Sequence, residues 1–92
     1  MHNVSYWFKA KRDLKEIKQF IAQDNIFYAR KVVETIVWFA NVNLSLFPLL
    51  WKEVSSSAHL REVVEPTFRY RIVYSFDWIQ VHIVSIFKYK DF

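Results

Sequence analysis

The hydrophobic pattern of this 92-residue chain changes its period near His59. In the first half, after a short alternating start, apolar residues recur at the three- and four-residue spacing of amphipathic helices. From residue 60 onward they alternate every second residue, which is the pattern of strands. A sheet with one apolar face is covered most simply by helices lying on that face. The change of period therefore predicts an α+β fold with two layers.

The first half predicts one strand and two helices. We expect the strand over 3–8, a helix over 9–22, and a second helix that Asp24 or Asn25 caps and that ends before Pro48. Either polar side chain can accept a backbone N–H bond of the first turn, and proline cannot continue a helix. Because the break between the helices is short, they should form an antiparallel hairpin.

The second half predicts a loop over 49–59, with Ser55-Ser56-Ser57 as its most flexible point, followed by three strands. These strands cover residues 60–64, 68–76 and 79–89, and the turns lie at Pro66-Thr67 and Asp77-Trp78. The last strand carries apolar residues on both faces, which predicts an interior, covered position. The order β-α-α-β-β-β predicts a helical hairpin packed on a mainly antiparallel sheet, as one domain over 1–92.

Composition excludes several functional classes. The chain has no glycine, so it lacks the Gly-rich loops that cradle nucleotide phosphates. It has no cysteine, which removes disulfides and thiolate metal sites. His2, His59 and His82 show no metal-ligand spacing, so we expect neither metal nor cofactor. The uncharged stretch 35–51 is too short and interrupted to span a membrane, and no signal peptide is evident, so we expect a cytoplasmic protein.

The aromatic content is high, with four Trp, five Tyr and nine Phe. A chain of this length cannot bury all these rings, and contiguous exposed apolar surface usually marks a binding site. The alternative is a dense aromatic core with the remaining rings scattered singly. We favour a partner groove with aromatic anchors. The net charge of +4 is compatible with an acidic partner, either nucleic acid or protein.

Three arginines follow the predicted C-terminal strands: Arg61, Arg69 and Arg71. Guanidinium groups match phosphate oxygens, and two residues two apart on a strand share a face, so Arg69 and Arg71 can converge. For RNA cleavage, Glu62 or Glu65 would be the base, and Tyr89 or Lys90 would move a proton. The favoured alternative is that these arginines face solvent or bind acidic groups of a partner. The basic residues of the first helix similarly suit a solvated face better than nucleic acid.

The order and spacing of several motifs resemble the RelE/ParE superfamily of bacterial toxins over essentially the whole chain. In the first helix the pattern is Ala10…Asp13-Leu14…Ile17…Phe20-Ile21-Ala22, and Pro48 follows the second helix as it commonly does in the family. The C-terminal half adds Leu60-Arg61-Glu62, Tyr70-Arg71-Ile72-Val73-Tyr74 and Val81…Ile83-Val84…Ile86.

This resemblance implies a toxin of a type II toxin–antitoxin module, a kind of module linked to growth inhibition and plasmid stabilisation. A small antitoxin neutralises such toxins in a hetero-oligomer. One branch cleaves ribosome-bound mRNA, whereas the ParE-like branch poisons DNA gyrase without being a nuclease. The tail departs from many members, because Phe87 stands where a histidine is common and Lys90 where an arginine is common.

We therefore favour a ParE-like toxin that inhibits gyrase by binding. The alternatives are a ribosome-dependent endoribonuclease and a degenerate toxin that serves only as antitoxin partner or co-repressor. Under the nuclease hypothesis the catalytic residues are Arg61, Arg71 and Tyr89. Under the binding hypothesis the residues that contact target or antitoxin are Trp51, Arg69, Phe87, Lys88, Lys90 and Phe92.

Overall fold

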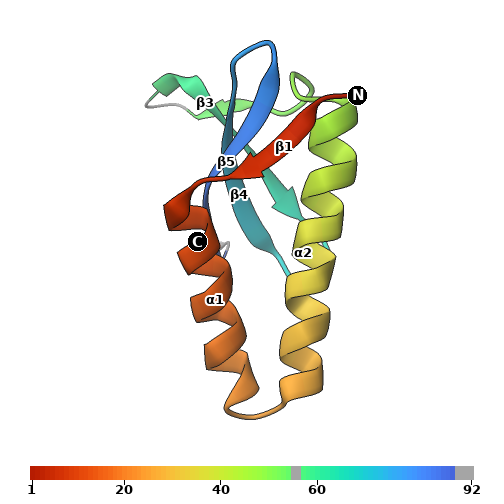
Figure 1. Ribbon diagram of the computed structural model, residues 1–92, viewed down its shortest axis with the longest axis vertical. Helices are drawn as coiled ribbons and strands as arrows, with labels where there is room; N and C mark the ends of the chain where they lie inside the picture. Colours follow the sequence, from red (N-terminus) through yellow and green to blue (C-terminus); the bar gives the residue numbers. More distant parts are fainter. Residues whose placement is uncertain (55–56, 89–92) are drawn as a thin grey trace.

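A computed structural model describes residues 1–54 and 57–88 of the chain. Its elements are β1 (Asn3–Tyr6), α1 (Phe8–Ala22), α2 (Ile26–Leu46), β2 (Glu53–Val54), β3 (Ser57–Glu65), β4 (Tyr70–Phe76) and β5 (Gln80–Lys88). The strands form one sheet in the order β1-β5-β4-β3-β2. β1 is parallel to β5, and the other neighbours are antiparallel. The predicted α+β fold, a helical hairpin on a mainly antiparallel sheet, is confirmed (Figure 1).

The two helices run antiparallel and are joined by a short connection at 23–25 (Figure 1). Asn25 caps α2, because its side-chain oxygen accepts the N–H of Tyr28 at 3.0 Å. α2 ends at Leu46, just before Pro48, as predicted. Its buried residues Val32, Ile36, Ala40 and Leu44 follow a four-residue spacing and pack on the sheet. Burying one such Ile or Leu side chain stabilises the fold by roughly 1.5–3 kcal/mol.

β5 is an interior strand, as predicted, but its apolar pattern has a different cause from the one expected. Val73 pairs with Ser85 and Tyr74 pairs with Ile83, so Val84 is an extra residue that shifts the register. This bulge restarts the alternation, and Ile83 and Ile86 are therefore both buried although three residues apart. The predicted covering of both faces is not needed to explain the apolar residues of this strand.

Before residue 60, the predicted boundaries are wrong in two places. Trp7 is the N-cap of α1, and Phe8 is already helical. The Trp7 N–H donates the last hydrogen bond of the β1–β5 pairing, to Ile83 O, and the Trp7 carbonyl accepts the first hydrogen bond of the helix. The predicted loop 49–59 contains the two-residue strand β2 and the start of β3. Such a short strand forms through pairing with Arg61 and its neighbours rather than through any pattern of its own. Ser55 and Ser56 lie outside the described residues.

The β4–β5 connection at Asp77-Trp78 forms without glycine, as predicted. Trp78 takes a positive φ of 72°, a conformation that glycine normally supplies. Asp77 stabilises the turn, since its Oδ1 accepts the N–H groups of Ile79 at 2.9 Å and Gln80 at 2.7 Å. Among the described residues, no helix has the length and apolar character to cross a membrane.

Candidate functional site

Arg71 lies on the face of the sheet opposite the helices. Ile72 and Tyr74 on the same strand are fully buried in the core beneath the helices. Because side chains alternate along β4, Arg71 points to the other side of the sheet. There its guanidinium lies 3.5 Å from a carboxylate oxygen of Glu62 and 5.6 Å from the ring centre of Phe87. Lys52 approaches the second Glu62 oxygen at 3.7 Å.

A pocket of about 350 Å³ opens beside this ion-pair network. It is lined by Leu50, Trp51, Lys52, Glu62, Val63, Val64 and Arg71. Two cations face one carboxylate, so the pocket carries a net positive charge that suits an anionic group of a partner. The indole Nε1 of Trp51 is buried and has no hydrogen-bond partner among the described residues. The structure thus brings three predicted site residues, Trp51, Arg71 and Phe87, to one region.

Arg61 does not join this pocket. It lies on the same side of β3 as the buried Val63, and its Nη1 donates to the carbonyl oxygens of Trp51 at 2.7 Å and Leu49 at 3.4 Å. A second nitrogen lies 3.7 Å from Glu53. The guanidinium therefore fastens the segment after α2 to the sheet. The structure separates Arg61 from Arg71, which the nuclease hypothesis would place together.

Arg69 does not share a strand face with Arg71, so this expectation was wrong. β4 begins at Tyr70, and Arg69 lies in the preceding turn with a φ of 61°. The cause is the buried Glu65, whose carboxylate accepts the N–H groups of Thr67 at 2.7 Å and Phe68 at 2.8 Å. These bonds build a turn at 66–69 where the alternation of the sequence predicts strand.

The end of β5 borders a groove along α1. Beyond Ile83 the edge of β5 no longer has β1 beside it, and α1 lies next to this edge instead (Figure 1). The carboxylate of Asp13 reaches across from α1 and accepts the N–H of Ile86 at 2.9 Å. Lys88 donates to the carbonyl of Phe68 and lies 4.8 Å from the ring centre of Tyr70. Tyr89, Lys90 and Phe92 lie outside the described residues.

This groove has a volume of about 520 Å³ and is mostly apolar. It is lined by Asp13, Glu16, Ile17, Phe20, Ile21, Tyr70, Ile86, Phe87 and Lys88. The Phe20 side chain is 72% exposed, although it belongs to the apolar residues of α1. Burial, with a smaller effect of Tyr28, raises the pKa of Tyr70 at the groove wall. An apolar groove beside a strand edge can receive a helix or an extended segment of another chain.

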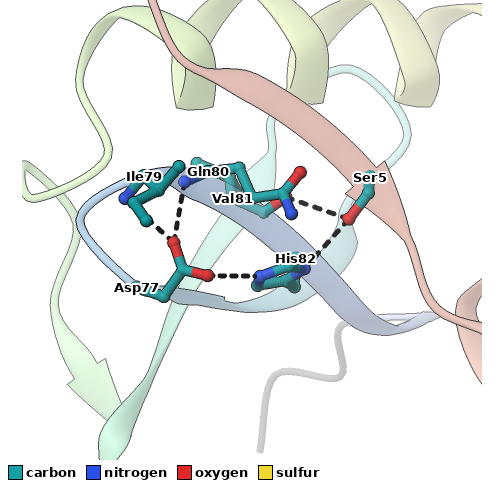
Figure 2. A network of polar contacts seen from close by, with 6 residues as sticks. All are labelled: Ser5, Asp77, Ile79, Gln80, Val81 and His82. Carbon is teal, nitrogen blue, oxygen red and sulfur yellow. Dashed lines mark hydrogen bonds and ion pairs between the residues drawn. The ribbon is translucent and has the colours of Figure 1, made fainter.

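A second polar network lies at the β1–β5 edge of the sheet and was not predicted (Figure 2). His82 contacts Ser5 Oγ through Nδ1 at 3.0 Å and Asp77 Oδ2 through Nε2 at 3.0 Å. Hydrogen bonds from the Gln80 amide, His82 and the Ile79 amide lower the pKa of Asp77 to about 2.

The Ser5–His82–Asp77 network resembles a hydrolytic triad in its residue types alone. The Ile79 and Gln80 amides beside Asp77 are bonded to its carboxylate, so they cannot stabilise an oxyanion. Ser5 also contacts the carbonyl of Val81 at 3.4 Å. The network therefore ties β1 to β5 and the β4–β5 turn. Within residues 1–54 and 57–88, no three His, Asp or Glu side chains are grouped to hold a metal ion.

Known structures share this architecture. A chain of the chromosomal ParDE TA system from P. aeruginosa superposes with a TM-score of 0.82 at 17% identity, covering 98% of both chains. This chain therefore shares the fold of the ParDE chain. The YoeB dimer from Staphylococcus aureus gives a TM-score of 0.64 at 19% identity, again covering 98% of both chains. No protein-family model matches the chain, and no curated protein matches its sequence. The likeness inferred from the motifs is thus confirmed for the fold.

Proposed function

We propose that this protein is the toxin of a type II toxin–antitoxin module, neutralised by a cognate antitoxin and acting by binding its target. DNA gyrase is the target that we favour. The observation that carries the proposal is the open groove between α1 and the end of β5, with its exposed Phe20 and the Asp13–Ile86 contact at its wall. Such a groove suits a segment of a partner chain better than a small substrate.

The likeness to solved structures supports the same proposal. The ParDE chain belongs to a TA system, and it superposes more closely than YoeB, with TM-scores of 0.82 and 0.64. A shared fold alone does not carry an activity. It does make an antitoxin the first candidate for the occupant of the groove.

The position of Arg61 supports binding over RNA cleavage. A cation that stabilises a phosphorane must face the scissile phosphate. Arg61 instead contacts two carbonyl oxygens of its own chain, on the other side of the sheet from Arg71. Arg71 itself is paired with Glu62. This arrangement lacks the converging arginines that the nuclease hypothesis invokes.

Brief expression of the chain in a bacterial host tests the target. We expect growth to stop, DNA supercoiling to be blocked and mRNA to stay intact. Codon-positioned mRNA cuts would contradict the binding mechanism and favour the nuclease. No toxicity, with antitoxin binding retained, would identify a degenerate toxin.

The groove is tested with Phe20→Glu, because a charge there opposes an apolar partner segment. We expect co-expression of the proposed cognate antitoxin to rescue growth with the unaltered chain and to fail with Phe20→Glu. Phe8→Glu is the matched control, since Phe8 is an exposed aromatic on the same helix and does not line the groove. Equal rescue of both variants would exclude the groove as the antitoxin site.

A ribosome-dependent nuclease remains the second candidate because one observation favours it. The pocket at Arg71 combines Lys52, the unpartnered Trp51 Nε1 and the carboxylate of Glu62, which are groups that can contact a phosphate or take a proton. Under this hypothesis Arg71→Gln abolishes mRNA cleavage while antitoxin binding persists. If toxicity survives in Arg71→Gln, the pocket is not catalytic.

A further inference from the structure

The outward face of α2 carries an apolar stripe that nothing in the described chain covers. Trp38, Val42 and Leu46 follow one another at four-residue intervals and are 66%, 37% and 49% exposed. The opposite face of the helix, with Ile36, Ala40 and Leu44, is fully buried in the core. A helix that is apolar on both sides is normally buried on both sides. We call Trp38, Val42 and Leu46 the α2 stripe.

The α2 stripe continues into a pocket at the C-terminal end of the helix. This pocket, of about 370 Å³, is lined by His2, Leu46, Phe47, Pro48, Leu49, Leu50, Phe76 and Trp78. Leu50 is 64% exposed and Trp78 is 72% exposed, so the pocket rim is apolar as well. The stripe and pocket together form one contiguous surface of the kind that marks protein interfaces.

The charge pattern indicates what covers this surface. From Thr35 to Trp51 the chain contains no Asp, Glu, Lys or Arg, whereas the whole chain carries a net charge of +4. An acidic antitoxin segment would find no opposite charge here, although it finds lysines elsewhere on the chain. A second copy of the chain would meet no like charge here, and an uncharged apolar patch can pack against the same patch of another copy about a two-fold axis.

We propose that two copies of this chain associate through the α2 stripe, with the two-fold axis near Val42. Trp38 and Leu46 lie four residues on either side of Val42. In an antiparallel pair Trp38 of each copy therefore meets Leu46 of the other, at the rim of the 370 Å³ pocket. Residues spaced by four form a ridge, and two such ridges pack at a crossing angle of about −50°.

This association is independent of the proposed toxin activity. The α2 stripe belongs to the outward face of the second helix, whereas the candidate antitoxin groove lies between α1 and β5. One pair of copies can thus hold two antitoxin segments.

The chain has no cysteine, so an introduced thiol is unique and its disulfide crosslinking tests the interface directly. Val42→Cys places one thiol at the proposed axis, so mild oxidation should give a disulfide-linked dimer of the full chain. Lys18→Cys on the exposed face of α1 is the control and should remain uncrosslinked at the same protein concentration. Equal crosslinking of the two variants, or none in Val42→Cys, would overturn the proposal.

Sedimentation velocity of the uncrosslinked protein gives a second readout that does not depend on thiol geometry. Trp38→Glu should weaken dimerisation by roughly tenfold or more, as loss of a central interface tryptophan does. Phe27→Glu, which alters an aromatic residue 78% exposed at the start of α2, should leave it unchanged. A monomeric unaltered chain, or a Trp38→Glu variant that dimerises as well as Phe27→Glu, would reject the α2 interface.

Alkylation of the Val42→Cys thiol tests the other occupant. If the thiol is protected only when the proposed antitoxin is added, the α2 interface is rejected and the stripe belongs to the antitoxin.

Discussion

Asp13 is the residue that joins the two layers at the groove. Its carboxylate accepts the Ile86 amide at 2.9 Å, where the edge of β5 extends past β1, and also contacts Lys9 at 2.9 Å. Without it a partly buried strand amide would lose its acceptor, which is costly. Asp13 therefore has a structural role in this fold, because it bonds α1 to the edge of β5.

Asp13→Ala should lower the free energy of unfolding by about 1–3 kcal/mol, because the Ile86 amide is left without an acceptor. Asp13→Asn should lose less, since its amide oxygen can still accept while only the exposed Lys9 pair is lost. Urea unfolding of the two variants measures the difference. Equal losses would show that the charge, rather than the acceptor, matters.

Asp77 makes the stability of the protein depend on pH. Its folded pKa of about 2 lies below the ordinary value of 3.8, so its contribution to stability is complete above about pH 4 and is lost as pH falls towards 2. Asp77→Asn keeps an acceptor for the two amides but cannot titrate. The stability difference between wild type and Asp77→Asn, from urea unfolding at each pH, should shrink between pH 4 and 2. A constant difference would contradict this assignment.

At the scale of elements, two side chains of the sheet hold the segment that follows α2. The Tyr74 hydroxyl donates to the Pro48 carbonyl at 2.6 Å, and Arg61 donates to the carbonyls of Leu49 and Trp51. Burial, partly offset by the Arg61 charge, raises the pKa of Tyr74 to about 12. The segment at 48–51 is thereby fixed against the sheet without glycine.

Tyr74→Phe should destabilise the protein by about 1–2 kcal/mol, because the ring still fills the core while the Pro48 carbonyl loses its donor. Thermal unfolding measures the loss. Tyr70→Phe, on the same strand face, serves as the control and should cost less, since Tyr70 is only partly buried. An equal loss of stability in both variants would mean that the hydrogen bond to the Pro48 carbonyl does not stabilise the fold.

For the whole molecule, the groove and the α2 stripe lie on different elements. Changes at such separate sites should act independently. Trp38→Glu should therefore leave the affinity for the proposed antitoxin within about twofold, and Phe20→Glu should leave the dimerisation constant within the same range. Isothermal titration with the antitoxin and sedimentation of each variant test both statements. A coupled response would mean that the two surfaces share one partner.

The layers of the fold follow from the sequence because hydrophobic period is a local property. The two helices, the strand over 60–64 and the interior place of β5 are confirmed, whereas the strand predicted over 68–76 begins only at Tyr70. The bulge at Val84 and the turn at Arg69 were missed, because they depend on pairing across strands and on the buried Glu65 carboxylate. In the sequence, a Glu before Pro-Thr indicates a turn only weakly, and the alternating pattern that follows favours a strand more strongly.

The candidate site was predictable only in part. Aromatic excess predicts a partner surface, but it does not say which rings remain exposed, since Phe20 falls on the predicted apolar face of its helix and is nevertheless 72% exposed. Arg61 carries the same chemistry as Arg71 in the sequence. Its contacts go to backbone carbonyls, which leave no trace in side-chain identity. The roles of such arginines are therefore decided by the tertiary structure.

The parallel pairing of β1 with β5 sets the order in which this protein can mature during synthesis. Asn3 pairs with Gln80 and Tyr6 with Ile83, so β1 has no neighbouring strand until nearly all of the described chain that follows it has been synthesised. Contacts so distant along the chain slow folding. The α1–β5 groove, which needs both ends, is completed at the same late moment. An antitoxin that binds there meets its site at the same step at which the protein becomes folded.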